Sequence, residues 1–459
     1  MIRVREIVAT YAICLALCAF SLRAQTRATD PQSHGSEVMQ EIAAGNFTKV
    51  EAQYNSAMAA ALPSGRLAQA WAQLTAKAGG FKSIVHTSAQ QMQGWQVVTL
   101  VASFQRATLD AIVAFDPDGR IAGLRFVPHQ EATEWAPPTY AHPSEFHERP
   151  VTITFLHWNL PGTLTVPNGT GPFPLLVLVQ GSGPHDEDET IGPNKPFKDL
   201  AWGLASRGIA VLRYVKRTKQ YGVKSSDDPQ ALTVNDEVID DARAAVNLAA
   251  EQPEIDRNRI CLLGHSLGGY LAPRIADGDA QIAGLIIMAG NTRPMEQIVV
   301  DQMRYLAAVS GLPADQANAQ IAKAENDAKA IESPALAKGQ TVELAGTRAP
   351  ASYFLDLRDY HPAKVAAHLK IPILVLQGGR DYQVTRADYD GWKQALAGHS
   401  NATFKFYPAL THLFTTSSMP GTGLAAPQDY AKPGHVEQQV IQDVASWMES
   451  PRKHGAGNP

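Results

Sequence analysis

Six short, continuous apolar runs follow one another in the second part of the chain, and helical patterns separate them. The runs are Pro174–Val179, Ile209–Leu212, Ile260–Leu263, Ile282–Met288, Pro372–Leu376 and Thr403–Tyr407. An unbroken apolar run of this length is typical of a strand that is buried on both faces, as in a parallel sheet. We therefore predict an α/β domain over residues 151–450, with a mostly parallel sheet and helices on both of its faces.

The edges and insertions of this domain can also be placed. A hairpin with arms at Val151–Trp158 and Pro161–Val166 is expected to open it. The clearest helix begins at Thr233, with Asp236 in the capping-box position. Residues 292–368 are rich in Ala and Gln, helical in pattern and without a good strand. Because they lie between two core strands, we predict an inserted helical cap; a longer ordinary crossover is the alternative.

A smaller α+β domain is expected over residues 36–127. Ser64 can cap a helix, and the pattern then changes to strand-like segments with a turn signal at Asp116–Gly119. Helices followed by such a meander predict a curved antiparallel sheet wrapped on helices. Residues 128–150 are rich in Pro and polar residues, which is typical of a linker.

The start of the chain has the features of a secretory signal over residues 1–24. Arg3 and Arg5 precede the apolar run Ile7–Phe20, which is shorter than the ~20 residues that a membrane span needs. A retained anchor is the alternative. Cleavage would leave Cys261 as the only cysteine, so no internal disulfide can form. We expect export to a periplasm or to the medium, with no stable membrane insertion afterwards.

The net charge argues against polyanionic partners. The 40 Lys and Arg residues and 44 Asp and Glu residues give a net charge of −4. This balance provides no electrostatic basis for binding nucleic acid or an anionic membrane surface.

The strongest chemical signal is the segment Gly264-His265-Ser266-Leu267-Gly268-Gly269. It follows a strand run and precedes a helical run, which is the context of a nucleophile elbow. Ser266 must then adopt a strained backbone conformation on a tight turn, and glycine at 264 and 268 lets the two arms approach without side-chain collision.

A serine hydroxyl needs a base to take its proton, and the base needs a carboxylate to orient it. Asp381 follows one late strand run and His412 follows the last one, so both fall at the carboxyl edge of the sheet in the order that this architecture uses. We assign Ser266 as nucleophile, His412 as general base and then acid, and Asp381 as its orienting carboxylate. A merely turn-forming Asp381 is the alternative.

The tetrahedral intermediate requires an oxyanion hole. We expect one donor to be the N–H of Leu267 and the second to be the N–H of Ser182, with Gly181 as the alternative, in the small-residue loop after Val179. The acidic run His185–Glu189 follows. We interpret it as a solvated loop held by Lys216 and Arg217, with a cation site as the alternative. No metal site is predicted.

Three stretches resemble a known family: QGSGPHDEDETIGPNKPFKDLAWGLASRGIAVLRY (180–214), GHSLGGYLAPRIA (264–276), and LQGGRDYQV with YPALTHLF (376–384 and 407–414). With them, residues 151–449 resemble the secreted α/β-hydrolase esterases of the esterase D-like group. Residues 36–127 resemble the cystatin-like or nuclear-transport-factor-like domain that often precedes such esterases.

This resemblance implies hydrolysis of short-chain carboxylic esters without a cofactor, and it matches Ser266, Asp381 and His412 to the family's triad. The chain departs from the family's pattern at three positions: Gln180 in place of His, Val215 in place of Asp, and Thr411 in place of Asn. An exported serine esterase acting on a small ester is thus the leading hypothesis, and a homodimer is a family-level expectation. The alternatives are a serine peptidase or amidase with the same triad, and a non-catalytic ligand-binding protein.

Overall fold

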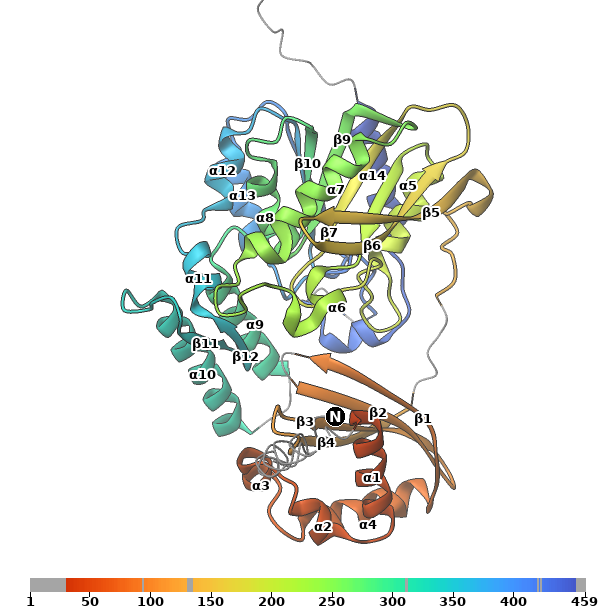
Figure 1. The fold of residues 1–459 in the computed structure, drawn as a ribbon, viewed down its shortest axis with the longest axis vertical. Helices are drawn as coiled ribbons and strands as arrows, with labels where there is room; N and C mark the ends of the chain where they lie inside the picture. Colours follow the sequence, from red (N-terminus) through yellow and green to blue (C-terminus); the bar gives the residue numbers. More distant parts are fainter. Residues whose placement is uncertain are drawn as a thin grey trace, which may run out of the picture. The chain divides into compact units, whose positions relative to one another are not determined.

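The computed structural model describes residues 30–92, 95–129, 135–309, 313–418, 421 and 423–450 (Figure 1). The chain divides into two compact units between Gln130 and Glu131. The predicted signal at residues 1–24 lies outside the described residues. Within the described ranges, no helix has both the length and the apolar character needed to cross a membrane.

The first unit places helices before an antiparallel meander, as the change of periodicity predicts. Its helices are α1 (Pro31–Ala43), α2 (Phe47–Glu51), α3 (Ser56–Ala61) and α4 (Arg66–Ala78). Its strands pair in the order β1 (Phe81–Met92), β2 (Trp95–Phe104), β3 (Thr108–Phe115) and β4 (Ile121–Pro128). Val38 and Ile42 of α1 are fully buried in one core with Val98 and Leu100 of β2. Gly65, and not Ser64, occupies the N-cap of α4.

The second unit is built on an eight-stranded sheet, shown with its helices in Figure 1. The strands are β5 (Phe146–Phe155), β6 (Trp158–Pro167), β7 (Phe173–Val179), β8 (Ala210–Tyr214), β9 (Ile255–His265), β10 (Ile282–Met288), β13 (Ile373–Gly378) and β14 (Ala402–Tyr407). Their spatial order is β14-β13-β10-β9-β7-β8-β6-β5, and only the pairings of β6 with β5 and β8 are antiparallel. This confirms the predicted mostly parallel sheet. The opening hairpin is present, but its turn lies between Phe155 and Trp158, so Trp158 begins the second strand and does not end the first.

Alternate residues of each central strand face opposite cores, which explains the unbroken apolar runs. Leu176 and Leu178 of β7 pack with α5 (Pro196–Ala205) and α14 (Gln438–Glu449) on one face. Leu175 and Val177 pack on the other face with α7 (Asp240–Ala250), α8 (Leu267–Ala276), α12 (Pro362–His368) and α13 (Arg386–Ala395). At the start of the helical segment that leads into α7, the main-chain N–H of Thr233 donates to Asp236, as the capping position predicts.

The segment 292–368 contains the expected helices, but it also contains strands. It comprises α9 (Met295–Val309), α10 (Ala314–Glu332), the antiparallel hairpin β11 (Thr341–Leu344) and β12 (Thr347–Pro350), α11 (Ala351–Leu357) and α12. The expectation of an insertion without strands is therefore wrong. The first arm does alternate between polar and apolar residues, but at four residues it has the minimum length for such a pattern and is easily overlooked beside the long helical segments that precede it.

The segment assigned to a linker is in part folded. Trp135 donates its indole N–H to the buried carboxylate of Asp199 on α5, and the buried Tyr140 donates its hydroxyl to the main-chain oxygen of Val436. β5 begins at Phe146, so the last five residues of the segment 128–150 belong to the sheet. The two aromatic residues fasten this segment onto the second unit, whereas its Pro-rich composition indicated only irregular backbone.

Candidate active site

Ser266 lies between the end of β9 and the start of α8, as the elbow motif predicts. Its backbone has φ 53° and ψ −116°, a strained conformation for a residue with a side chain. A Cβ on Gly264 would lie 2.1 Å from the main-chain oxygen of Gly268, and one on Gly268 would lie 2.3 Å from that of Val179. Only glycine fits at these two positions. At Gly264 the turn brings the end of β9 into backbone contact with the start of α8, and at Gly268 the start of α8 packs against the end of the neighbouring strand β7.

His412 and Asp381 meet at the same edge of the sheet. His412 Nδ1 lies 2.7 Å from Asp381 Oδ2, and the side chains are 4% and 0% exposed. Since Nδ1 faces the carboxylate, Nε2 is the ring nitrogen left to exchange a proton with a nucleophile. This is the arrangement of a base with its orienting carboxylate.

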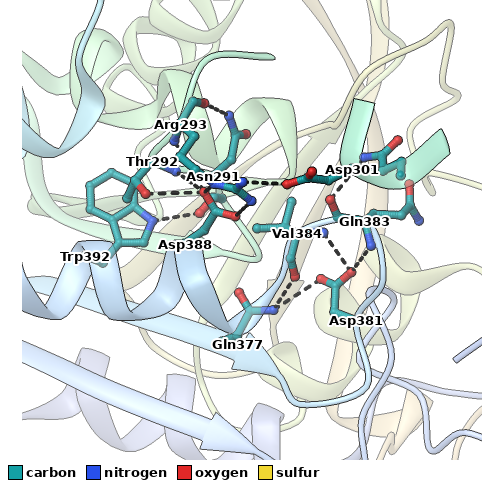
Figure 2. Close-up of polar contacts among 12 residues, drawn as sticks. Asn291, Thr292, Arg293, Asp301, Gln377, Asp381, Gln383, Val384, Asp388 and Trp392 are labelled. Atoms are coloured by element: carbon teal, nitrogen blue, oxygen red, sulfur yellow. Dashed lines mark hydrogen bonds and ion pairs between the residues drawn. The ribbon is translucent and has the colours of Figure 1, made fainter. Parts of the chain in front are cut away.

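Asp381 is itself fixed by its own loop (Figure 2). Its Oδ1 accepts the main-chain N–H groups of Gln383 and Val384, at 2.7 and 3.0 Å, while its Oδ2 accepts the amide of Gln377 at 3.3 Å. Asp381 thus shapes the turn with one oxygen and contacts His412 with the other, so its place in the turn is compatible with an orienting role.

Glycines bring the loops of Asp381 and His412 together. A Cβ on Gly378 would lie 2.4 Å from the main-chain oxygen of Thr411, and one on Gly379 would lie 2.8 Å from Pro408. Thr411 is fully buried; its hydroxyl shares a hydrogen bond with that of Thr415 and accepts the Leu413 N–H. Thr411, which stands where the resembling family has Asn, therefore uses its hydroxyl to stabilise the loop that carries His412.

His265 connects the elbow to the loop of His412. Its Nε2 lies 3.0 Å from the main-chain oxygen of His412, and the two rings are 4.6 Å apart between centroids. Its Nδ1 lies 2.8 Å from Glu189 Oε2, and both side chains are buried. These contacts place His412 beside the residue that precedes Ser266.

The charge state of the buried Glu189–His265 pair follows from its surroundings. Burial alone would raise the pKa of Glu189, but the charge and hydrogen bond of His265 hold that pKa below its usual value. Burial would likewise lower the pKa of His265, but the Glu189 carboxylate and the oxygen of His412 raise it overall. Both shifts favour the charged forms of the two groups, as expected for a buried acid and base that share a hydrogen bond.

The loop after β7 lies against the elbow because the sheet reverses its winding there. β7 pairs with β8 on one side and β9 on the other, while α5 and α8 cover opposite faces, so the loops after β7 and β9 border a topological switch point. A Cβ on Gly181 would lie 3.0 Å from Ser266 Cβ.

Of the two main-chain N–H groups in this loop that could serve the oxyanion hole, those of Gly181 and Ser182, only one is left without a partner in the described structure. The Gly181 N–H donates to Glu189 Oε1 at 2.6 Å, which favours Ser182 as the oxyanion donor. Leu267 is the first residue of α8, where no preceding helical carbonyl can accept its N–H.

The acidic run 185–189 is more buried than the solvated loop that its composition indicated. The expected contact with Lys216 is present as a main-chain hydrogen bond, in which the Lys216 N–H donates to the main-chain oxygen of His185 at 3.1 Å. Asp188 and Glu189 are buried, Asp188 pairs with Arg213 and Lys195, and Glu189 pairs with His265. Arg217 instead pairs with the buried Asp241 on α7. Within the described part of the chain, no group of three His, Cys, Asp or Glu side chains is arranged to hold a metal ion.

Two site residues escape the sequence analysis: Glu189, and Lys216, whose ammonium contacts the main-chain oxygen of Gly181. Both could have been found from the sequence. Each lies in a loop that follows a strand run, and the carboxyl ends of these strands lie at the same edge of the sheet as Ser266. Gln180 donates its amide to the main-chain oxygen of Tyr214, which ties the loops after β7 and β8 together.

Two family models match the chain. Residues 35–124 match "Protein of unknown function (DUF3887)", and residues 195–417 match "Serine aminopeptidase, S33". Among solved structures, Est1E of Butyrivibrio proteoclasticus with bound ferulic acid is 17% identical, with 65% of this chain and 97% of that chain covered and a TM-score of 0.42. The acylaminoacyl peptidase of Pyrococcus horikoshii is 13% identical, with coverage of 82% and 51% and a TM-score of 0.45.

The similarity to Esterase EstD of Thermotoga maritima extends along most of the chain. It is 38% identical over 410 residues, which cover 89% of this chain and 93% of the relative. Identity at this level over both units, together with the parallel sheet and its elbow, shows that this chain belongs to the α/β-hydrolase esterase family that includes EstD.

Proposed function

We propose that this chain is an exported serine esterase that hydrolyses carboxylic esters with short acyl chains through an acyl-enzyme. One observation supports this most directly: the buried His412–Asp381 pair, 2.7 Å apart, lies beside an elbow whose serine has φ 53°. A strained serine beside an oriented imidazole is costly to build and is the arrangement that activates a hydroxyl.

The proposed reaction has two halves. Ser266 Oγ attacks the ester carbonyl while its proton moves to His412 Nε2, and the N–H groups of Leu267 and Ser182 stabilise the oxyanion. Collapse of the intermediate breaks the ester C–O bond, and His412 gives the proton to the leaving alcohol. Water then loses a proton to His412 and attacks the acyl-enzyme. The bond between the acyl carbon and Ser266 Oγ breaks, His412 returns the proton to Ser266 Oγ, and the acid is released.

A serine peptidase or amidase is the second candidate, because the model matched by residues 195–417 is described as a serine aminopeptidase. The same triad performs both reactions, so only substrates separate them. Export rests on the residues at the start of the chain.

The test labels the purified protein with a fluorophosphonate and measures turnover of acetyl and butyryl nitrophenyl esters and of an aminoacyl nitroanilide. We expect labelling and ester turnover in the wild type, loss of both in Ser266→Ala, and no change in Ser446→Ala, which removes an exposed hydroxyl on α14. Faster turnover of the anilide would favour the peptidase. A folded wild type that is neither labelled nor active would overturn the proposal in favour of a binding protein.

A further inference from the structure

Lys216 is almost fully buried, although burial of a lysine ammonium is energetically unfavourable. It lies two residues beyond the end of β8, and its side chain is 2% exposed. Its Nζ lies 2.9 Å from the main-chain oxygen of Gly181 and 2.7 Å from Glu237 Oε1. Removing an ammonium from water is unfavourable, and apolar side chains of similar volume often stabilise such sites better. Stability alone therefore does not account for this residue.

The oxygen that Lys216 binds belongs to the peptide group that joins Gly181 to Ser182. This peptide is trans. A trans peptide is planar, and its C=O and N–H point in opposite directions. Fixing the oxygen on Lys216 therefore fixes the direction of the Ser182 N–H, which points away from the ammonium.

The rest of this peptide's surroundings is also fixed. Glu189 accepts the Gly181 N–H, and His185 Nε2 lies 2.7 Å from the main-chain oxygen of Ser182. Among the described residues, no acceptor is found for the Ser182 N–H itself. The peptide lies close to the nucleophile, because a Cβ on Gly181 would approach Ser266 Cβ to 3.0 Å. The loop thus leaves one donor unused beside Ser266.

We propose that Lys216 is a positioning residue, which orients and polarises the 181–182 peptide so that its N–H stabilises the oxyanion. This inference rests on the proposed esterase function. An ammonium bound to the peptide oxygen draws electron density towards that oxygen, and the N–H at the other end becomes a stronger donor. This preorganisation acts on the transition state and leaves substrate binding largely unchanged.

Glu237 extends this arrangement into the inserted segment. Its Oε1 pairs with Lys216, while its Oε2 accepts the hydroxyl of Tyr353 on α11 at 2.7 Å. Glu237 thereby holds the ammonium in place and is itself held by the insertion. Tyr353→Phe is expected to weaken the same step, by a smaller factor than loss of Lys216.

The experiment compares Lys216→Met with the double variant Lys216→Met/Glu237→Gln, which avoids an unpaired buried carboxylate. Lys195→Met is the matched control, because Lys195 pairs with Asp188 in the same acidic loop at 2.9 Å. Fluorophosphonate titration counts the active sites, and urea unfolding establishes which variants are folded. Nitrophenyl acetate turnover and inhibition by a boronic acid, which forms a tetrahedral adduct on Ser266, are then measured per site.

We expect kcat/KM to fall about 10- to 100-fold in both Lys216 variants, somewhat less than the 10²–10³ for complete loss of an oxyanion donor, with KM within about threefold. Boronic acid affinity should fall by the same factor, and Lys195→Met should match the wild type. A folded double variant with wild-type kcat/KM and boronic acid affinity would overturn the inference while leaving the esterase function intact. An inactive wild type would instead mean that the proposed function has failed.

Discussion

His265 Nε2 lies 3.0 Å from the main-chain oxygen of His412, which is 147 positions further along the chain. Its other ring nitrogen faces Glu189, so both ring nitrogens face oxygen atoms, an arrangement that favours the doubly protonated imidazolium. His265 joins the elbow, the loop after β7 and the loop of His412.

The first prediction concerns the pH dependence of this ion pair. The His265 pKa is raised above its usual 6.5, so its contribution to stability is complete below that value and is lost as pH rises through the raised pKa. The Glu189 pKa is lowered below its usual 4.5, so its contribution is complete above that value and is lost as pH falls through the lowered pKa. The pair should stabilise the fold most between about pH 4.5 and 6.5.

Glu189→Gln tests this window by urea unfolding across pH. We expect the stability difference from the wild type to be largest inside the window and to shrink above it. Glu251→Gln, at an exposed position at the end of α7, should show a small difference at every pH. A Glu189→Gln difference that stays constant from pH 5 to pH 9 would contradict the ion pair.

Asp381→Asn should keep the turn but disable the base. The remaining oxygen can still accept the Gln383 and Val384 N–H groups, whereas the new amide would donate to His412 Nδ1 and leave the proton on Nε2. This is the wrong tautomer for accepting a proton from Ser266, and kcat should fall by about 10⁴. Asp390→Asn, at a half-exposed carboxylate on α13, should leave kcat unchanged. Comparable kcat values for the two variants in nitrophenyl ester assays would argue against the assigned role.

Gly268→Ala should prevent proper closure of the elbow. The added methyl would meet the main-chain oxygen of Val179 at 2.3 Å, and both backbones are held by β7 and α8. We expect a loss of more than about 3 kcal/mol in the free energy of unfolding. Gly398→Ala, whose methyl would have no neighbour within 4 Å, should change stability by less than about 1 kcal/mol. Equal stabilities in urea would show that the elbow can relax.

The inserted segment is anchored at its start by Arg293, which pairs with the fully buried Asp388 on α13 and with Asp301 on α9 (Figure 2). Arg293→Ala leaves Asp388 without its cation, and we expect a loss of about 3–5 kcal/mol. Arg304 also pairs with Asp301, but it is 54% exposed, so Arg304→Ala should cost less than about 1 kcal/mol. Urea unfolding measures the difference, and limited proteolysis should cut the segment faster in Arg293→Ala alone. Similar losses in the two variants would mean that the anchor lies elsewhere.

The strands of the sheet and the position of the elbow could be predicted from the sequence, because both depend on residues that are neighbours along the chain. The runs Pro174–Val179 and Ile260–Leu263 predict strands buried on both faces. Each residue of such a strand faces one core or the other, so every position is apolar and the pattern is visible in the sequence. The glycines around Ser266 are equally readable, since one tight turn accepts no other residue there. Chain order then separated Asp381 and His412 from the other acidic residues and histidines, because each follows a strand run.

The tertiary structure alone decided the partners of the charged residues. In the sequence, Glu189 looks like part of a solvated acidic loop, and Lys216 and Arg217 look like the cations that hold this loop. The switch point between β7 and β9 instead brings Glu189 to His265 and Lys216 to the Gly181 peptide, while Arg217 meets Asp241. Ion pairs depend on the distance and burial that crossovers create between remote segments, and no local pattern records these quantities.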